Sequence, residues 1–284
     1  HMPYQLPEAV TARRQFDFEV KRLADSLSFG GDPSRFLGSG LEYAESRPYE
    51  PGDPVKSMDW RVTARTGKPY VKVYEATRQV AVYLLVDTSA SMCVASTDRS
   101  KYEWAVRLAA ALARAAQERM SPVGLLAAGD RDLRVTPTLS TSSAMRWAHE
   151  LRLYDFREGT RLSTRLRTLA ASLKARTLVV VLSDLHEPEA FSAMELLAAS
   201  HEVITLWLED PAEAKPPRGG IFRAREAETG QPFVLTRRTR LTTHDRIRNS
   251  LVDGGIEFLH LPVDRPVLPR LRHFLKHRKS MGHA

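Results

Sequence analysis

Residues 80–91 decide the fold, and their sequence from Val80 to Ser91 is VAVYLLVDTSAS. The first seven residues are apolar and rich in β-branched side chains, which is typical of a strand buried on both faces of a parallel sheet. Asp87 therefore ends a central strand, at the edge of the sheet where open α/β proteins bind ligands. Alternation places Asp87, Ser89 and Ser91 on one side of the following turn. Their oxygens are hard donors, which suit Mg²⁺ or Mn²⁺ rather than zinc.

A second apolar run also ends in a carboxylate. Residues 178–182 have the sequence LVVVL and are followed by Ser183 and Asp184. Between the two predicted strands, Thr160 stands at the start of a predicted helix and adds a hydroxyl group. Because the carboxyl ends of parallel strands share one edge of a sheet, we expect Asp87 and Asp184 to meet where the strand order reverses. The predicted metal site is therefore assembled from three loops.

The pattern D-x-S-x-S, then a lone Thr, then a strand-terminal Asp resembles the metal-ion-dependent adhesion site of von Willebrand factor A domains. This resemblance implies that Ser89, Ser91 and Thr160 bind the metal, while Asp87 and Asp184 hold bound waters. It also implies one open coordination position, which an Asp or Glu of a partner protein fills in A-domain proteins.

Strands and helices alternate over residues 79–284, which predicts an α/β, Rossmann-like domain with a mostly parallel central sheet flanked by helices. Residues 1–78 form a predicted N-terminal extension with one short amphipathic helix, over residues 15–28, and a strand, over residues 70–74. This stretch offers too small a core to fold alone, so we expect it to pack on the sheet domain. Trp60 is expected to cover the sheet.

Local signals predict several further elements. Ser100 and Glu103 have the spacing of a capping box, which opens an alanine-rich helix that runs to about Met120. Residues 219–236 are expected to form a β-hairpin that turns at Thr229-Gly230. Residues 267–277 have the apolar spacing of an amphipathic helix.

A set of motifs before the central strand adds a second resemblance. The motifs are Arg47-Pro48-Tyr49-Glu50-Pro51-Gly52-Asp53, Met58-Asp59-Trp60-Arg61, Thr63-Ala64-Arg65 and Val71-Lys72-Val73. Together with the D-x-S-x-S loop they are similar to the bacterial family called domain of unknown function 58, in its short branch without transmembrane helices. The resemblance implies a metal-dependent partner or adaptor of MoxR-type AAA+ ATPases.

Composition limits the other possibilities. The chain has 284 residues, a formal net charge of +8 and one cysteine, Cys93. It contains no run near the ~18 apolar residues that span a bilayer, and no signal peptide is visible, so we expect a cytoplasmic protein. The single cysteine fits a reducing compartment. The basic charge leaves a nucleic-acid-binding module as the alternative function.

The sequence favours a non-enzymatic protein. It has no Gly-x-x-x-x-Gly-Lys-Ser/Thr loop to bind phosphates, and position 89 is a serine where a haloacid-dehalogenase-type phosphatase needs a second carboxylate. Ser183, Asp184 and His186 are too close in the chain for a hydrolase triad. His186 is expected at the rim near the metal, solvated or in contact with a partner. The nine histidines show no zinc-binding spacing.

Overall fold

The computed structural model describes residues 10–28, 41–76, 80–153, 159, 161–214, 222–225, 232–235 and 237–278. Its α-helices are α1 (Val10–Ser28), α3 (Trp60–Thr66), α4 (Lys101–Glu118), α5 (Thr141–Arg152), α6 (Leu162–Ser172), α7 (Glu189–Ala198), α8 (Pro211–Ala214), α9 (Arg237–Asp253) and α10 (Val267–His277). Its strands are β1 (Leu41–Pro48), β2 (Tyr70–Ala76), β3 (Val82–Val86), β4 (Val123–Ala127), β5 (Arg134–Thr138), β6 (Leu178–Ser183), β7 (Glu202–Glu209), β8 (Phe222–Arg225), β9 (Pro232–Leu235) and β10 (Glu257–Pro262). Two short 3-10 helices are η1 (Val55–Ser57) and η2 (Ala90–Cys93).

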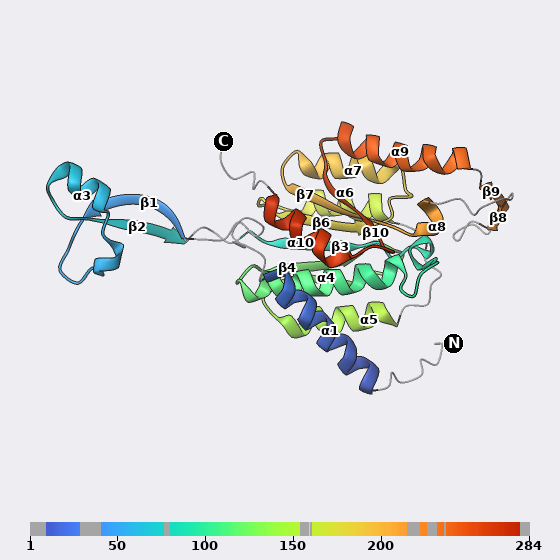
Figure 1. Cartoon of the computed structure of the whole chain (residues 1–284), viewed down its shortest axis with the longest axis horizontal. Helices are drawn as coiled ribbons and strands as arrows, with labels where there is room; N and C mark the ends of the chain where they lie inside the picture. The colour runs from blue at the N-terminus through green and yellow to red at the C-terminus, as the bar shows by residue number, and fades with distance from the viewer. Residues whose placement is uncertain are drawn as a thin grey trace.

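A six-stranded sheet forms the centre of the molecule, with the strand order β10-β7-β6-β3-β4-β5 (Figure 1). All neighbouring pairs are parallel except β4 with β5, which is antiparallel. From β3 the chain continues to β4 on one side, and it later returns to β6 on the other side. The order of strands therefore reverses between β3 and β6, as the sequence predicts, and this confirms an α/β fold with a mostly parallel sheet.

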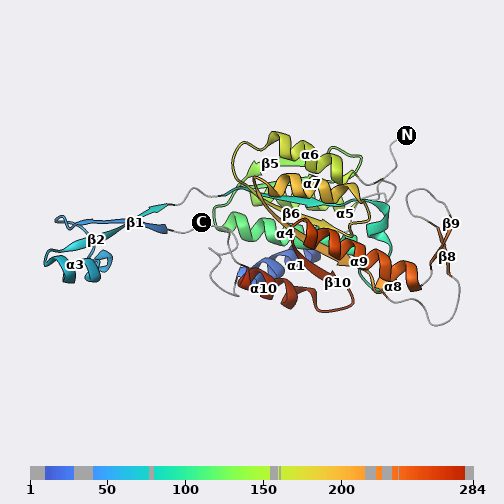
Figure 2. The ribbon, with the colours of Figure 1, turned by 90° about the horizontal axis from the view of Figure 1, so that it is seen from above.

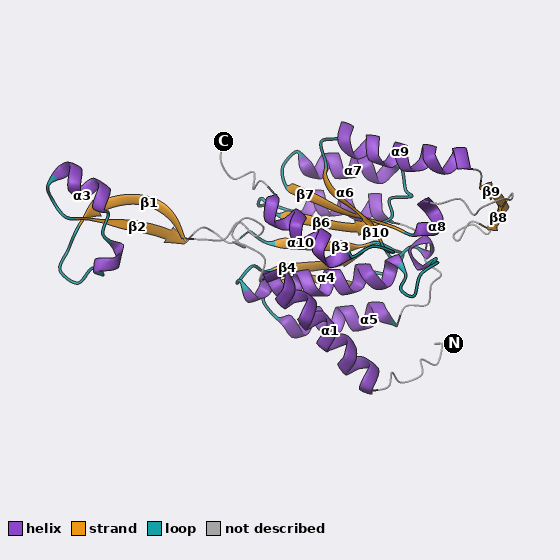
Figure 3. Ribbon diagram, in the orientation of Figure 1, coloured by secondary structure: helices purple, strands orange, loops and turns teal. Residues whose placement is uncertain are grey.

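Helices cover both faces of this sheet (Figure 3). Alternate residues of β6 point to opposite faces, so Val180 belongs to one hydrophobic cluster and Val181 to the other. The first cluster contains buried residues of α1, α4, α5 and α10, and the second contains buried residues of α6, α7 and α9. This two-sided burial explains why the central strands are apolar throughout.

Several predicted elements are confirmed. Ser100 and Glu103 form a capping box at the start of α4, with Glu103 N donating to Ser100 Oγ over 3.1 Å and Ser100 N donating to Glu103 Oε2 over 2.9 Å. α10 covers residues 267–277 as predicted. β8 and β9 pair as an antiparallel hairpin, while its expected turn at Thr229-Gly230 lies outside the described residues. β5 was not predicted, since Arg134–Thr138 is half polar and contains a proline.

The extension before residue 79 divides into two parts that behave differently. α1 packs on the sheet domain, and the side chains of Phe16, Val20 and Leu23 are buried in the first hydrophobic cluster. This part of the packing expectation is correct. Figure 2 shows α1 lying alongside α4 and α10.

The second part is a lobe of β1, β2, α3 and η1 that projects away from the sheet domain (Figures 1 and 2). The expectation that this part of the extension packs on the sheet domain is therefore wrong. Trp60 is 65% exposed, so the expectation that it covers the sheet is also wrong. Polar contacts hold the lobe together instead: Asp59 caps α3 and accepts a 2.5 Å hydrogen bond from Ser46 Oγ, and Arg47 forms two hydrogen bonds with Asp53. These local bonds replace the large core that the sequence lacks here.

Among the residues that the structure describes, no helix combines the length and the apolarity needed to cross a membrane.

Candidate metal centre

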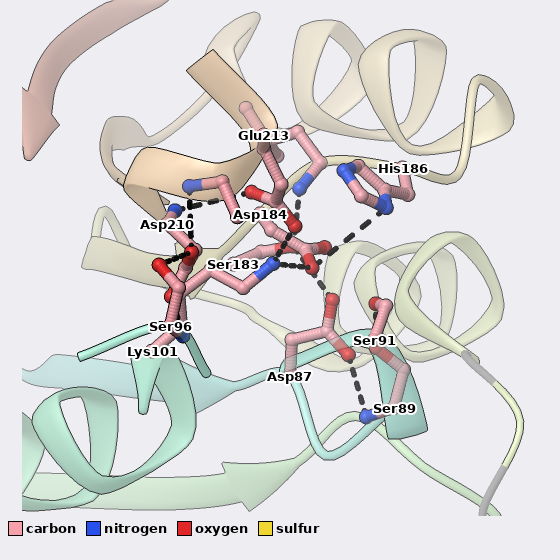
Figure 4. Close-up of polar contacts among 12 residues, drawn as sticks. Asp87, Ser89, Ser91, Ser96, Lys101, Ser183, Asp184, His186, Asp210 and Glu213 are labelled. Atoms are coloured by element: carbon pink, nitrogen blue, oxygen red, sulfur yellow. Dashed lines mark hydrogen bonds and ion pairs between the residues drawn. The ribbon is translucent and has the colours of Figure 1, made fainter. Parts of the chain in front are cut away.

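Asp87 lies at the carboxyl end of β3 and is held from three directions. Its backbone N–H donates to Leu182 O over 2.9 Å, which extends the pairing of β3 with β6. Its Oδ1 accepts a 2.9 Å hydrogen bond from Ser89 N, and its Oδ2 accepts a 2.6 Å hydrogen bond from Ser183 Oγ. The side chain is therefore fixed between the ends of two central strands (Figure 4).

The two serines of the D-x-S-x-S loop lie beside Asp87. Ser89 precedes η2 and is buried, Ser91 is half-buried, and their Oγ atoms are 3.0 Å apart. Thr160 lies outside the described residues. Its neighbours bind the end of β4, since Arg161 N donates to Ala128 O over 3.0 Å and Gly159 N donates to Asp130 Oδ2 over 3.3 Å. The chain on either side of Thr160 thus reaches the same edge of the sheet.

Asp184 follows β6 and faces Asp87 across the edge of the sheet. Its Oδ2 accepts a 2.8 Å hydrogen bond from Lys101 Nζ, and the Lys101 side chain is fully buried. The other oxygen, Oδ1, is buried and has no well-formed hydrogen bond to any residue that the structure describes. The next residue, Leu185, has a positive φ of 60°, which is rare for leucine and reflects the tight turn after β6.

The carboxyl groups of this edge influence each other's protonation. Burial, together with the negative charge of Asp184, raises the pKa of Asp87 to about 6, although hydrogen bonds from Ser183 and Ser89 oppose the change. Burial also acts to raise the pKa of Asp184, but electrostatic interactions with His186 and Lys101 outweigh it and lower that pKa. Two buried carboxylates at one edge repel each other when both are ionised. A cation bound between them would stabilise their ionised forms.

Lys101 also connects the site to α8, the short helix that follows β7. Its ammonium group donates a short hydrogen bond to Glu213 Oε1, and Glu213 Oε2 accepts a 3.1 Å hydrogen bond from Asp210 N. Asp210 in turn accepts hydrogen bonds from the backbone and side chain of Ser96, in the loop after η2. Figure 4 shows this chain of contacts from Asp184 to Asp210.

The side-chain oxygen atoms of the described residues are suited to bind a hard divalent cation. Asp87 and Asp184 provide carboxylate oxygens, Ser89 and Ser91 provide hydroxyl oxygens, and Oδ1 of Asp184 is a buried acceptor without a well-formed bond. All of these are oxygen ligands, which Mg²⁺ and Mn²⁺ prefer. Among the residues just named no nitrogen or sulfur ligand is present.

His186 lies at the rim, as the sequence predicts. Its Nδ1 is 3.8 Å from Asp184 Oδ2, and its side chain is 43% exposed. Ser183 is fully buried, donates to Asp87 and accepts a 2.9 Å hydrogen bond from Leu185 N. The Ser183 hydroxyl is thus engaged in holding the turn, which argues against its use as the nucleophile of a triad with His186 and Asp184.

Sequence reasoning missed four residues of this network: Ser183 as a structural donor, Lys101, Asp210 and Glu213. Lys101 is the first residue of α4, a position where lysine is usually solvated, so nothing in its local sequence indicates burial. Asp210 and Glu213 follow a strand that ends at the same edge of the sheet. The position of Asp210 directly after an apolar strand is the one sequence feature that could have predicted its place in this network.

Fold and site together define an α/β protein with a cluster of hard oxygen ligands at the switch point of its sheet. The chain belongs to the family described as protein of unknown function DUF58, whose sequence pattern matches residues 45–252. It is 30% identical to uncharacterized protein Rv1480 of Mycobacterium tuberculosis and to uncharacterized protein Mb1516 of Mycobacterium bovis, over 96% of this chain and 90% of each relative.

Two solved structures show partial likeness. The conserved hypothetical protein BatB from Bacteroides thetaiotaomicron is 19% identical and has a TM-score of 0.49, covering 68% of this chain and 96% of BatB. The RO (RSR) protein of Deinococcus radiodurans is 15% identical with a TM-score of 0.35, covering 95% of this chain and 49% of that protein. None of these names states an activity.

Proposed function

We propose that this protein is a metal-dependent protein–protein interaction module, built as a von Willebrand factor A-like domain with a metal-ion-dependent adhesion site. One observation carries the proposal: the buried carboxylates of Asp87 and Asp184 face each other beside Ser89 and Ser91 at the switch point of the sheet. Lys101 offsets only part of this negative charge, and a divalent cation would offset the rest.

In this proposal Ser89, Ser91 and Thr160 bind Mg²⁺ or Mn²⁺ directly, and Asp87 and Asp184 hold waters of the ion. The bound ion supplies an electrophilic position that accepts a carboxylate oxygen from a partner. The chain's own residues orient the site: Ser183 and Ser89 N fix Asp87, and Lys101 fixes Asp184. Because most direct ligands are neutral hydroxyls, the cation keeps its attraction for the partner's Asp or Glu.

The partner that we propose is a MoxR-type AAA+ ATPase or its client, in a chaperone-like or complex-maturation process of the cytoplasm. This choice rests on what the resemblance of the motifs over residues 47–73 implies, since the matched family is itself described as of unknown function. The chain has no phosphate-binding loop of its own, so ATP hydrolysis would belong to the partner. His186 is 43% exposed beside Asp184 and is the residue that we expect to contact the partner next to the metal.

A nucleic-acid-binding module is the second candidate. The lobe presents Trp60, which is 65% exposed, together with the exposed Arg61 and Arg65, and the whole chain has a net charge of +8. An exposed indole beside guanidinium groups is suited to base stacking and phosphate contact. This surface is independent of the residues around Asp87.

Metal and salt dependence separate the two candidates. The full-length chain is used as bait in a native bacterial lysate, with Mg²⁺ or with EDTA, at low and at moderate salt. A metal-dependent module should retain its partner at moderate salt and lose it in EDTA, whereas nucleic-acid binding should fall steeply with salt and ignore EDTA.

A double variant sharpens this experiment. Ser89→Ala with Ser91→Ala should lose the Mg²⁺-dependent partner, and the control Ser142→Ala with Ser172→Ala, at two exposed serines, should keep it. Capture that is equal for both double variants would contradict the proposed function. Loss of capture in Trp60→Ala with unchanged EDTA response would favour the nucleic-acid candidate.

A further inference from the structure

A second cluster of metal-ligating side chains lies at the end of β7, immediately before Asp210. Glu209 is the last residue of β7, His260 lies on the neighbouring strand β10, and His244 lies on α9. His244 Nδ1 is 2.8 Å from Glu209 Oε2, and His260 Nε2 is 3.1 Å from Glu209 Oε1. One ligand atom from each of the three residues lies within 4.8 Å of the other two.

The surroundings hold these side chains in place and leave the two imidazoles partly exposed. Trp207 is buried, and its ring lies 4.8 Å from the His244 ring and 4.4 Å from the His260 ring, measured between centroids. The side chain of Glu209 is 9% exposed, whereas those of His244 and His260 are 31% and 25% exposed. The indole packing restricts the rotation of both imidazoles, while part of each imidazole side chain remains exposed to solvent.

Hydrogen bonds within the described residues leave one nitrogen of this cluster unsatisfied. Burial acts to raise the pKa of Glu209, but contacts with His260 and His244 outweigh it and lower that pKa, so the carboxylate is ionised. His260 Nε2 is buried and makes no well-formed hydrogen bond within the described residues, despite its short distance to the carboxylate. A buried ring nitrogen beside an ionised carboxylate is the arrangement that a metal ion completes.

We propose that Glu209, His244 and His260 form a second metal site that binds Zn²⁺. Two imidazole nitrogens and one carboxylate are the ligand set of three-ligand zinc sites, in which a fourth position holds water or an exogenous group. This donor set differs from the all-oxygen set around Asp87, so the two sites select different metals. The proposed zinc site could not be predicted from the sequence, because its ligands are separated by 35 and 16 residues in the chain (244 − 209 and 260 − 244).

The test is a calorimetric titration of the metal-free, full-length chain with Zn²⁺, in the absence and presence of excess Mg²⁺. We expect one tight zinc ion per chain that Mg²⁺ does not displace. His244→Ala, His260→Ala and Glu209→Gln should each weaken that zinc binding by at least about 100-fold, since even the outer partners of metal ligands contribute 10- to 100-fold. Co²⁺ should give a visible spectrum of four-coordinate type in the wild type and lose it in these variants.

Two control variants exclude other histidines. His273 and His277 are exposed one turn apart on α10, with ring centroids 4.1 Å apart, and are able to chelate a metal at the surface. Both His273→Ala with His277→Ala and His186→Ala should retain the tight zinc ion. Loss of zinc binding in either control would assign the ion elsewhere and overturn the proposal.

Folding is monitored by thermal unfolding of each variant in EDTA. Glu209→Gln keeps the size and most hydrogen-bonding capacity of the side chain, so it decides the result if a histidine variant does not fold. Zinc affinity that is unchanged in Glu209→Gln, or the lack of any stoichiometric zinc binding by the wild type, would overturn the proposal. Ser89→Ala with Ser91→Ala should leave zinc binding intact, which keeps this test separate from that of the proposed function.

Discussion

Lys101 Nζ lies 2.8 Å from Asp184 Oδ2, and the two side chains are 0% and 1% exposed. The carboxylate that faces the candidate metal position therefore has a built-in positive partner. Because the same ammonium also binds Glu213, it joins the end of β6 to α8, the short helix that follows β7. One lysine thus orients Asp184 and anchors the loop that leads from Glu209 toward the metal centre.

Lys101→Met should lower the free energy of unfolding by about 3–5 kcal/mol, because it leaves the buried Asp184 without its partner. Lys174→Met, at an exposed loop position, should change it by less than about 0.5 kcal/mol. Urea unfolding in EDTA measures both values. Equal stability of the two variants would show that the ammonium of Lys101 has no structural role.

The stability of the metal-free protein should depend on Asp87 between about pH 4 and pH 6. Burial raises the pKa of this group to about 6, so in this range the folded protein binds more protons than the unfolded chain. The contribution of Asp87 to stability is therefore complete below about pH 4 and lost as the pH rises through 6.

Comparison with Asp87→Asn measures this contribution. The free energy of unfolding of the wild type, relative to that of Asp87→Asn in EDTA, should fall by on the order of 3 kcal/mol from pH 4 to pH 7. Asp98→Asn, at an exposed position, serves as the control and should follow the wild type. A difference between wild type and Asp87→Asn that stays constant with pH would refute the raised pKa.

Two phenylalanines of α1 test how this helix is attached. Phe16 is 2% exposed in the first hydrophobic cluster, whereas Phe18 is 68% exposed. Phe16→Ala should cost about 3–5 kcal/mol of unfolding free energy, and Phe18→Ala less than about 0.5 kcal/mol. If urea unfolding gave similar small losses for both, α1 would not be part of the core.

The purified chain should hydrolyse neither ATP nor phosphate esters, because it has no phosphate-binding loop and position 89 is a serine. Colorimetric phosphate release with Mg²⁺ or Mn²⁺ is the measurement. Turnover above background that disappears in Asp87→Asn would identify an enzyme instead.

The sheet domain could be predicted from the sequence because its signals are local and repeated. The apolar runs that end at Val86 and Leu182 mark buried parallel strands, and the capping box at Ser100 marks the start of α4. Because Asp87 and Asp184 directly follow these two parallel strands, the same patterns predict that they lie at one edge of the sheet. β5 escaped prediction because an edge strand with one solvated face needs few apolar residues.

The lobe and the long-range polar partners could not be predicted. The contacts that hold the lobe together, such as the one between Ser46 and Asp59, are single hydrogen bonds. Such contacts leave no periodic pattern of apolar residues in the sequence. Lys101 and Glu213 are 112 residues apart and meet only when the sheet is assembled. Amphipathic spacing predicts which face of a helix is buried, but it does not predict a buried charge whose partners come from other loops.

Calorimetric titration of the full-length chain with Mg²⁺ and Mn²⁺ tests the central claim most directly, with a thermal melt of each protein in parallel. The wild type should bind one ion, and Ser89→Ala with Ser91→Ala should abolish this binding while the melting temperature in EDTA stays the same. The control Ser142→Ala with Ser172→Ala should bind as the wild type does. Unchanged Mg²⁺ and Mn²⁺ affinity in the Ser89/Ser91 variant would contradict the assignment of the metal centre.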